Sequence, residues 1–492
     1  MTRRAPPLEI NSRHTTTEPS VHRSVKTGGR RGSFFLGLCF LAALGGCRTL
    51  PDVELARTLP LSRSRTPVQI ESPDGLVGRA ARLRMTRKLA ATGDTALLDY
   101  HLAAMRDIGA PPLLTGNHVE LLNDGPSTYR AMFAAIEAAR DYVFVESFIF
   151  EEAVHEDRKL SALLRDATRR GVAVYVIYDA VGSLATAAEF LESLRGARVA
   201  LCAFNPVNPL DERFAGLNHR DHRKIVVTDG EHAFAGGINF SRAYRIASRQ
   251  LKGRGFSKQQ SIDQGWRDTH VGVRGPGARE LEKLFRDTWV RAACEGELPP
   301  PGAGEARDAG NTVLQIVAST PADERNVLYA TMLSVITYAQ KSIDLTMAYF
   351  VPDDNLEDAL KDAARRGVAV RIILPSYSDF SGVFYAGRAH YKGLLDAGVR
   401  LFELESAFLH SKSIVVDGVW SSVGSTNFDW RSFVHNDEIS VCVIDEGFAR
   451  AMARTFEADL AESREITPAD WKKRGFKERF KELLWLPLQY WL

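Results

Sequence analysis

From about Gly116 onward, apolar residues alternate between two spacings along the chain. Residues 128–140 and 160–170 place apolar side chains at helical spacing, which predicts amphipathic helices. Residues 142–150 and 172–178 are nearly continuous apolar runs, which favour buried strands. Helices that alternate with apolar strands are typical of a sheet covered on both faces, so we expect an α/β fold.

The same order of elements returns in the second part of the chain. The hexapeptide Arg-Arg-Gly-Val-Ala-Val occurs at residues 169–174 and again at 365–370. A period of about 190 residues indicates a duplicated domain and not a solenoid repeat. We therefore predict a tandem duplication of one α/β sandwich domain, with two halves related by a pseudo-two-fold axis and the active site at their interface. The second set of helices and strands is expected at residues 326–340, 342–350, 356–366 and 368–375.

Composition shifts divide the chain into six predicted segments. The boundaries follow a basic and apolar start, a mixed polar stretch, the two repeats with a Pro- and Gly-rich stretch between them, and a basic aromatic end. The segments are an export signal (1–46), a tether with a short helical cap (47–115), a first domain (116–296), a linker (297–312), a second domain (313–465) and an amphipathic tail (466–492).

The N-terminus predicts export from a bacterial cytoplasm. Basic residues, among them Arg30 and Arg31, precede an apolar run from Phe34 to Leu44, and Gly45-Gly46-Cys47 follows. The run is shorter than the roughly 20 residues that a membrane-spanning helix needs. Because Leu44-Gly-Gly-Cys47 resembles the cleavage box of bacterial lipoproteins, we expect lipidation of Cys47 and a lipid-anchored protein of the cell envelope. An ordinary signal peptide and a transmembrane anchor are the alternatives.

Charge and cysteine content narrow the chemistry. The 492 residues carry a formal charge of +2, but residues 1–46 hold seven Lys and Arg against two Asp and Glu, so the remainder is slightly acidic. This balance argues against a nucleic-acid partner held by bulk charge. Removal of the signal leaves Cys47 with Cys202, Cys294 and Cys442, and no Cys-x-x-Cys pair occurs. We expect these last three to be buried thiols, with neither a zinc site nor a disulfide framework.

One constellation of residues occurs once in each half, at matching spacing and an offset of 188 residues. Each copy has His-x-Lys, four residues, Asp, six residues, and then a Gly-x-x-Asn segment. Such a matched pair has a small risk of being accidental. The residues are His222, Lys224, Asp229 and Asn239 in the first copy and His410, Lys412, Asp417 and Asn427 in the second.

This set of side chains suits a phosphodiester substrate. Residues i and i+2 of a strand share a face, so each His should stand beside its Lys. One imidazole can attack phosphorus while the other protonates the leaving alkoxide. Ammonium and carboxamide groups can hold the non-bridging oxygens, so we predict no metal ion and no cofactor.

Further roles follow from chemistry and position. A nucleophilic imidazole needs a carboxylate on its other nitrogen, and Asp268 and Glu438 open strand-like segments after each motif. Asp229 and Asp417 precede glycines at predicted hairpin turns, so a structural role is as well supported as a chemical one. Four histidines outside the matched pattern are expected to be bystanders: His219, His232, His270 and His435.

These motifs resemble the duplicated HxKxxxxD signature of the phospholipase D superfamily. Flanking segments resemble bacterial cardiolipin synthases, among them Glu146-Ser-Phe-Ile-Phe and Asn427-Phe-Asp-Trp-Arg-Ser. The resemblance implies the phospholipase D fold, and it implies joining of two phosphatidylglycerols into cardiolipin, with release of glycerol, through a phosphatidyl-histidine. It also implies that His222 is the nucleophile and His410 the acid and base, although pseudo-symmetry leaves the exchange of these roles open.

The C-terminal tail supports a membrane substrate. Thr467-Pro468 predicts a capped helix start, and Phe476, Phe480, Leu483 and Leu484 follow among basic residues. Aromatic and basic residues together favour a lipid interface, and a terminal helix packed on the body is the alternative. The motifs also leave open a hydrolase or a transferase with another acceptor, a phosphodiesterase for nucleic acid and an inactive scaffold.

Overall fold

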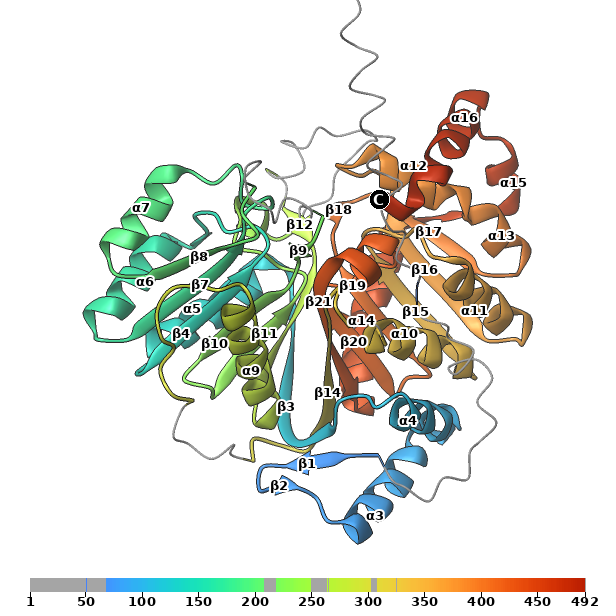
Figure 1. The fold of residues 1–492 in the computed structure, drawn as a ribbon. Helices are drawn as coiled ribbons and strands as arrows, with labels where there is room; N and C mark the ends of the chain where they lie inside the picture. The colour runs from blue at the N-terminus through green and yellow to red at the C-terminus, as the bar shows by residue number, and fades with distance from the viewer. Residues whose placement is uncertain are drawn as a thin grey trace, which may run out of the picture. The chain divides into compact units, whose positions relative to one another are not determined.

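The computed structural model describes residues 50, 68–207, 218–248, 263, 265–301, 308–323 and 325–491. These residues belong to one compact unit, Leu50–Leu492 (Figure 1). The predicted export signal and Cys47 lie outside the described residues.

The first half of this unit is built on a mixed sheet. Its long apolar runs form the central strands β4 and β7, which pair in parallel, and the strands around the first motif add to them antiparallel. From one edge to the other the order is β3 (Leu113–Asn123), β13 (Thr269–Arg274), β11 (His232–Gly236), β10 (Lys224–Thr228), β4 (Tyr142–Ser147), β7 (Ala173–Asp179) and β8 (Ala200–Phe204).

The second half repeats this order strand for strand. Its neighbours and their directions are the same, and one strand, β22, extends the far edge. The predicted duplication of an α/β domain is therefore confirmed. The order is β14 (Thr312–Ser319), β21 (Asn436–Ile444), β20 (Trp420–Gly424), β19 (Lys412–Val416), β15 (Ser342–Met347), β16 (Ala369–Pro375), β17 (Arg400–Leu404) and β22 (Ser463–Ile466).

The two sheets join along equivalent edges, because β3 pairs antiparallel with β14 (Figure 1). Two short parallel pairings also link the halves. Residues Arg220–Asp221 (β9) pair with the start of β21, and Trp266–Arg267 (β12) pair with Phe408–Leu409 (β18). Each of these links lies immediately before a motif histidine, so the halves meet at the predicted site.

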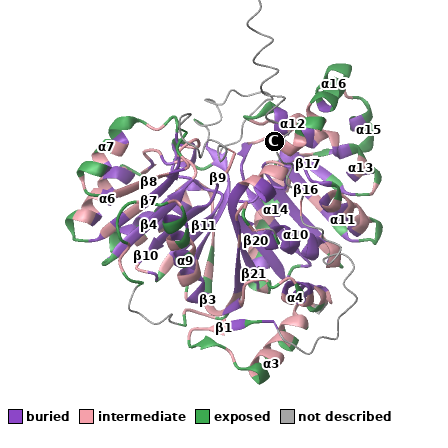
Figure 2. Cartoon of the chain, in the orientation of Figure 1, coloured by how far each residue is buried: buried purple, intermediate pink, exposed green. Residues whose placement is uncertain are grey.

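Helices cover both faces of the sheets and bury them (Figure 2). The predicted helix 128–140 begins earlier, at Asp124, and the other predicted helices end within about two residues of their expected positions. The first half has α5 (Asp124–Ala138), α6 (Leu160–Arg169), α7 (Ala188–Gly196) and α9 (Pro276–Arg291), with a small hairpin of β5 (Val154–His155) and β6 (Arg158–Lys159) and the 3-10 turn η3 (Arg242–Tyr244). The second half has α10 (Val327–Tyr338), α11 (Asp354–Arg365), α12 (Ser381–Ala389), α13 (Tyr391–Asp396), the short π-helix η4 (Arg431–His435) and α14 (Glu446–Ala461).

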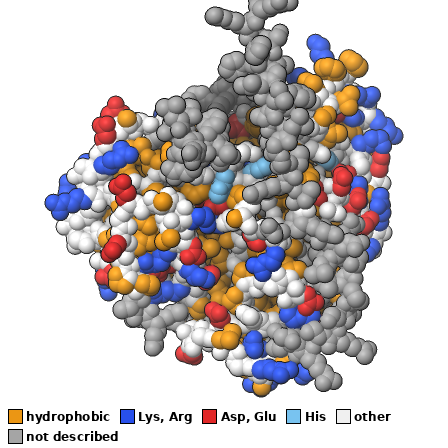
Figure 3. Space-filling view, in the orientation of Figure 1, with side chains coloured by type: hydrophobic (Ala, Val, Ile, Leu, Met, Phe, Trp, Pro, Cys, Tyr) orange, Lys and Arg blue, Asp and Glu red, His pale blue; other side chains and the backbone are white. Residues whose placement is uncertain are grey.

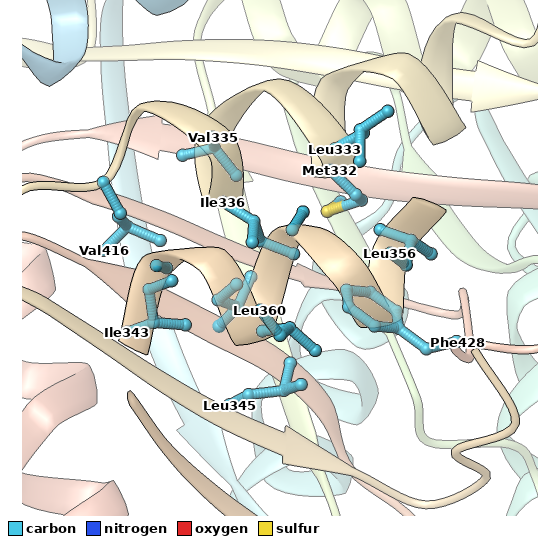
Figure 4. Packing of buried hydrophobic residues seen from close by; sticks show 14 of the residues in the cluster. Met332, Leu333, Val335, Ile336, Ile343, Leu345, Leu356, Leu360, Val416 and Phe428 are labelled. Atoms are coloured by element: carbon cyan, nitrogen blue, oxygen red, sulfur yellow. The ribbon is translucent and has the colours of Figure 1, made fainter. Parts of the chain in front are cut away.

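Helix α10 explains why a cap precedes the first domain. The helix is apolar on nearly all faces, and a helix of that kind must be covered on all sides. Strand β15 and helix α11 cover part of it (Figure 4), and strand β14 and helix α4 of the cap cover other parts. The cap consists of β1 (Ile70–Ser72), β2 (Gly75–Leu76), α3 (Arg79–Ala90), η1 (Thr92–Asp94) and α4 (Leu97–Asp107).

A disulfide corrects the cysteine prediction. Cys202, on β8, and Cys294, just after α9, are joined through their sulfur atoms across 92 residues of sequence. Cys442 is a buried free thiol, as expected. The expectation of three thiols is wrong for the other two, because spacing along the sequence could not reveal that the end of α9 lies beside the edge strand.

The tail folds as α15 (Pro468–Lys472), α16 (Phe476–Trp485) and η5 (Leu486–Trp491). Thr467 caps α15 by accepting a hydrogen bond from the amide of Asp470, which confirms the predicted helix start. No helix among the described residues combines the length and the apolar character needed to cross a bilayer.

Candidate active site

Each motif histidine lies between a short strand that pairs with the opposite half and a longer strand in the sheet of its own half. His222 lies between β9 and β10, and His410 lies between β18 and β19. Each long strand begins only at the lysine, so the expectation that His and Lys share one regular strand is wrong. At each histidine the backbone is still hydrogen-bonded to the opposite half. The backbone N–H of His222 donates to the carbonyl of Asp437 (3.0 Å), and that of His410 donates to the carbonyl of Arg267 (2.8 Å).

Each imidazole is held by a carboxylate from the opposite half. His222 Nδ1 lies 2.9 Å from Glu438 Oε1, and His410 Nδ1 lies 2.7 Å from Asp268 Oδ2. All four side chains are buried or nearly so. The structure thus brings together the two histidines and the two carboxylates that the sequence singled out. A bond at Nδ1 fixes the ring orientation and leaves Nε2 as the nitrogen that can meet a substrate.

The two motif lysines lie beneath the histidines. Lys224 Nζ donates to the carbonyl of His222 (2.5 Å) and Lys412 Nζ donates to that of His410. Each ammonium also faces an aromatic ring, Phe148 at 5.3 Å from its centroid and Tyr349 at 5.9 Å. Burial lowers the pKa of Lys224 to about 7 and that of Lys412 to about 8. Because both lysines lose their protons readily, a bound anion would stabilise their charged forms.

Charges differ between the two His–carboxylate pairs. Burial and the nearby lysines and His410 hold the pKa of His222 well below its usual value. The pKa of His410 is lowered by burial and Lys412 but is supported by Asp268. In turn, His410 and Lys412 lower the pKa of the Asp268 carboxyl against the effect of burial, whereas burial raises that of Glu438 to about 7. The pseudo-symmetric site is therefore electrostatically asymmetric.

The side chains around the two carboxylates also differ between the halves. Glu438 accepts hydrogen bonds from Ser425 Oγ and from Asn436 Nδ2 (3.1 Å). The position equivalent to Ser425 is Gly237, where an added Cβ would lie 2.1 Å from Asp268 Oδ1. Only glycine therefore fits beside Asp268, and this explains the second glycine of the first motif's Gly236-Gly237 pair.

Tyr244 is a site residue that the sequence did not reveal. Its hydroxyl donates to Asp268 Oδ2 (3.1 Å) and lies 3.0 Å from His410 Nδ1. It follows Asn239 by five residues, and the equivalent position after Asn427 is Ser432. A comparison of the two repeats position by position would have marked this difference, but not its direction toward Asp268.

Arg223, between the first His and Lys, was also missed. Its buried guanidinium donates to the carbonyls of Glu438 (3.2 Å) and Ser319 (2.9 Å) and to Thr288 Oγ1 (3.1 Å). It therefore joins α9 of the first half to two strands of the second, beneath the site.

The two motif asparagines occupy equivalent buried loops. Asn239 Oδ1 accepts from the amide of Ile149 (3.0 Å), which fixes the direction of its carboxamide. The backbone N–H of Asn427 donates to Ser432 Oγ (3.2 Å), and the buried side-chain Oδ1 of Asn427 has no hydrogen-bond partner among the residues described.

Asp229 and Asp417 bind backbone at hairpin turns. Asp229 accepts from the amides of residues 140, 141 and 142, each at 2.9 Å, and it has a positive φ of 55°. Asp417 accepts in the same way from residues 340, 341 and 342 and also from Thr95 Oγ1 of the cap (2.8 Å). These contacts fix where strands β4 and β15 begin and account fully for both carboxylates.

The histidines outside the motifs have other surroundings. His219 Nε2 lies 2.8 Å from Asp437 Oδ1, beside the site but not on its carboxylate pair. His270 is buried with its pKa lowered to about 3, and His232 is half-buried at the first hairpin. The ring of His435 meets Tyr490 edge-on. Among the described residues no cluster of His, Cys, Asp and Glu has the makings of a metal site.

Comparisons with known proteins agree with this geometry. The sequence model for "Cardiolipin synthase, PLD-like domain" matches residues 132–246 and 332–460. Cardiolipin synthase A of Pseudomonas aeruginosa (strain LESB58) is 37% identical over 369 residues, which cover 75% of this chain and 72% of that protein. Cardiolipin synthase A of Pseudomonas putida (strain W619) is 38% identical over 375 residues, covering 76% and 74%.

Similarity of fold extends to a more distant enzyme. A crystal structure of phosphatidylserine synthase from Haemophilus influenzae Rd KW20 superposes with a TM-score of 0.56 at 12% identity, covering 79% of this chain and 98% of that one. A duplicated α/β domain with one His–Lys pair from each half is the architecture of a phospholipase D-superfamily enzyme. Within that superfamily the chain belongs to the cardiolipin synthase family of phosphatidyltransferases.

Proposed function

We propose that the enzyme joins two phosphatidylglycerol molecules into cardiolipin and releases glycerol. The observation that carries this proposal is the pair of imidazoles, each fixed at Nδ1 by a carboxylate of the opposite half. Such a pair supplies a nucleophile and an acid on one phosphodiester, as a two-step exchange of alcohols on phosphorus requires.

In the first step, Nε2 of His222 attacks the phosphorus of one phosphatidylglycerol. The bond between phosphorus and the glycerol headgroup breaks, and His410 gives its proton to the departing glycerol oxygen. The products of this step are glycerol and a phosphatidyl group on His222. Lys224 and Lys412 balance the charge on the non-bridging oxygens, and the amides of Asn239 and Asn427 assist them.

In the second step, a terminal hydroxyl of another phosphatidylglycerol gives its proton to His410 and attacks phosphorus. The bond to His222 breaks, which restores the free imidazole and yields cardiolipin. His410 is then protonated again and ready for the next cycle. Water in place of the second lipid would yield phosphatidic acid by the same route.

The electrostatic asymmetry supports this division of roles. A nucleophilic imidazole must be unprotonated, and the pKa of His222 is held well below its usual value. An acid must keep a proton, and although burial lowers the pKa of His410, Asp268 favours its protonated form and offsets part of that shift. We also propose that the reaction needs no metal ion, since the lysines supply positive charge at the site; full activity in the presence of a chelator is the expected result.

We further propose that the enzyme acts in the cell envelope, anchored through a lipidated Cys47. The disulfide between Cys202 and Cys294 supports a folded part that lies in an oxidising compartment. Mass spectrometry of the N-terminal peptide tests this: a diacylated Cys47 is expected, and an unmodified peptide that begins upstream would contradict the anchor.

Lipid analysis tests the reaction. The purified full chain is added to phosphatidylglycerol vesicles, and the lipids are read by mass spectrometry beside His222→Ala and His410→Ala. His232→Ala is the matched control, because this histidine lies at a hairpin outside the site. Cardiolipin and glycerol from the wild type and the control alone are expected. Phosphatidic acid without cardiolipin would make the protein a hydrolase and contradict the synthase assignment.

A further inference from the structure

The outer face of α16 exposes a row of large apolar side chains. Phe476 is 81% exposed and Leu483 is 70% exposed, and Phe480 and Leu484 lie between and beside them at helical spacing. Soluble surfaces seldom gather such residues without a partner. In Figure 3 this end of the second half carries hydrophobic side chains interspersed with basic ones.

Helix α16 is fixed to the body by a buried acid on its inner face. Glu482 is buried, its Oε2 accepts from Arg474 (3.0 Å), and its Oε1 lies 3.9 Å from Arg388 of α12. Trp485 packs from the same helix against Val351 and Val383. The exposed apolar row is therefore held in place and is not the inner face of a loosely attached tail.

Two further exposed apolar residues occupy equivalent positions in the two halves. Leu184 follows the end of β7 by five residues and is 73% exposed, and Phe380 follows the end of β16 by five residues and is 47% exposed. Both loops leave the C-terminal ends of the central parallel strands, and at the same ends of β4 and β15 the pairings of Lys224 with Ser147 and of Lys412 with Met347 place the motif histidines. Exposed apolar side chains thus flank the site in both halves.

The surface made by α16 is also linked to the site wall. Tyr349, which faces the ring of His410 and the ammonium of Lys412, belongs to the same apolar cluster as Trp485 and Val383. A partner surface in contact with α16 would therefore have a fixed position relative to His410.

Charge selects one kind of occupant. Residues 471–485 contain six basic and two acidic residues, and one of those acids is the buried Glu482. Basic side chains among exposed aromatic and leucine residues suit the headgroup and upper acyl region of an anionic bilayer. Surfaces that bind protein partners are usually depleted of lysine, unlike this one.

We propose that the outer face of α16, together with Phe380 and Leu184, forms a lipid-docking rim that seats the end of the sheets carrying the motif histidines on an anionic phospholipid surface. This proposal deepens the proposed function, because it requires a phospholipid substrate but not a particular acceptor. The rim orients the body so that headgroups reach the histidines while acyl chains stay in the bilayer.

A depth-sensitive label tests the contact directly. The environment-sensitive dye NBD is attached to Leu483→Cys in the full chain carrying Cys47→Ser, and Leu76→Cys is the matched control. Leu76 is an exposed leucine on β2, at the end of the molecule remote from α16 in Figure 1. With phosphatidylglycerol vesicles the emission from position 483 should shift to the blue, and that from position 76 should not. Equal responses at the two positions would overturn the proposal.

Activity on two forms of the substrate gives a second test. The double variant Phe480→Ser/Leu483→Ser should lose about tenfold of its turnover on phosphatidylglycerol vesicles, since two apolar contacts with lipid are removed. Turnover of monomeric dihexanoyl phosphatidylglycerol should be unchanged, and Leu76→Ser should behave as the wild type on both. Unchanged vesicle turnover in the double variant would contradict the rim. The label reports docking whichever product forms, so failure of the synthase assignment remains distinguishable.

Discussion

At the scale of single residues, the site differs between its two halves where the motifs do not. The same His and Lys occur twice, but Asp268 faces Tyr244 and Gly237, whereas Glu438 faces Ser425 and Asn436. A symmetric pair of histidines could exchange roles. The two halves of the site therefore differ in the side chains around the carboxylates, and not in the motif histidines and lysines.

Replacement of Tyr244 by Phe should lower kcat about tenfold, the usual effect of losing one hydrogen bond to a charged group. Without this donor, the Asp268–His410 pair should hold its proton more tightly, so the alkaline limb of the kcat profile should move to higher pH. Tyr100→Phe, on α4 of the cap, serves as the control. If kcat falls but the pH profile of kcat does not shift, Tyr244 only packs against the site and does not influence the Asp268–His410 pair.

Lysine protonation should limit activity on the alkaline side. Because Lys224 and Lys412 have pKa values lowered to about 7 and about 8, the free enzyme loses these charges as the pH rises through that range. We expect kcat/KM to fall as the pH rises above about 7, and more steeply above about 8, since this parameter reports the free enzyme. In Lys412→Arg, whose guanidinium stays charged, the fall should be shallower by about one proton. An identical slope in this variant would contradict a role for the Lys412 charge.

At the scale of elements, the hairpins after the motifs act as fixed points for the central strands. Asp229 and Asp417 each bind three successive backbone amides where β4 and β15 begin. The motif aspartates therefore fix the positions of β4 and β15. Because β10 and β19 pair with these strands, the aspartates also help to position the lysines.

Asp229→Ala should lower the free energy of unfolding by about 1–3 kcal/mol, because backbone donors lose their acceptor. Urea denaturation measures this loss, and Glu231→Ala at the same hairpin is the control. Turnover per folded molecule should stay within about threefold of the wild type. A hundredfold loss of turnover with unchanged stability would instead assign Asp229 to the chemistry.

Much of the element order could be predicted from the sequence, because buried strands and amphipathic helices each have a local period. The pairing of His222 with Glu438 could not, since 216 residues separate them and both carboxylates occupy similar places after their motifs. The strand assignment of His222 failed because its link to β21 of the other half leaves no mark in the local pattern. Tyr244 escaped notice because nothing in its local sequence signals a contact with Asp268, 24 residues further along the chain.

At the scale of the whole molecule, the described residues are held together by the interface between the halves and by one disulfide. The cluster formed by α9, α14 and strands of both sheets is shared between the repeats. The disulfide closes a long loop within the first half, from β8 to the end of α9.

Reduction of this disulfide should lower the free energy of unfolding by about 2–4 kcal/mol, because it removes a constraint on the unfolded chain. Urea denaturation with and without a thiol reductant measures the change. The double variant Cys202→Ser/Cys294→Ser should show the lower stability in both conditions and no further effect of the reductant. Equal stability of the oxidised and reduced wild type would contradict the link.

The crossing of carboxylates between halves has a consequence for how the two repeats depend on one another. Neither repeat holds a complete histidine–carboxylate pair of its own, so neither would work as an isolated fragment. Two separate chains could assemble the same centre only at concentrations that favour their association. In the fused chain the two repeats associate within one molecule, so the activity per molecule does not depend on the protein concentration.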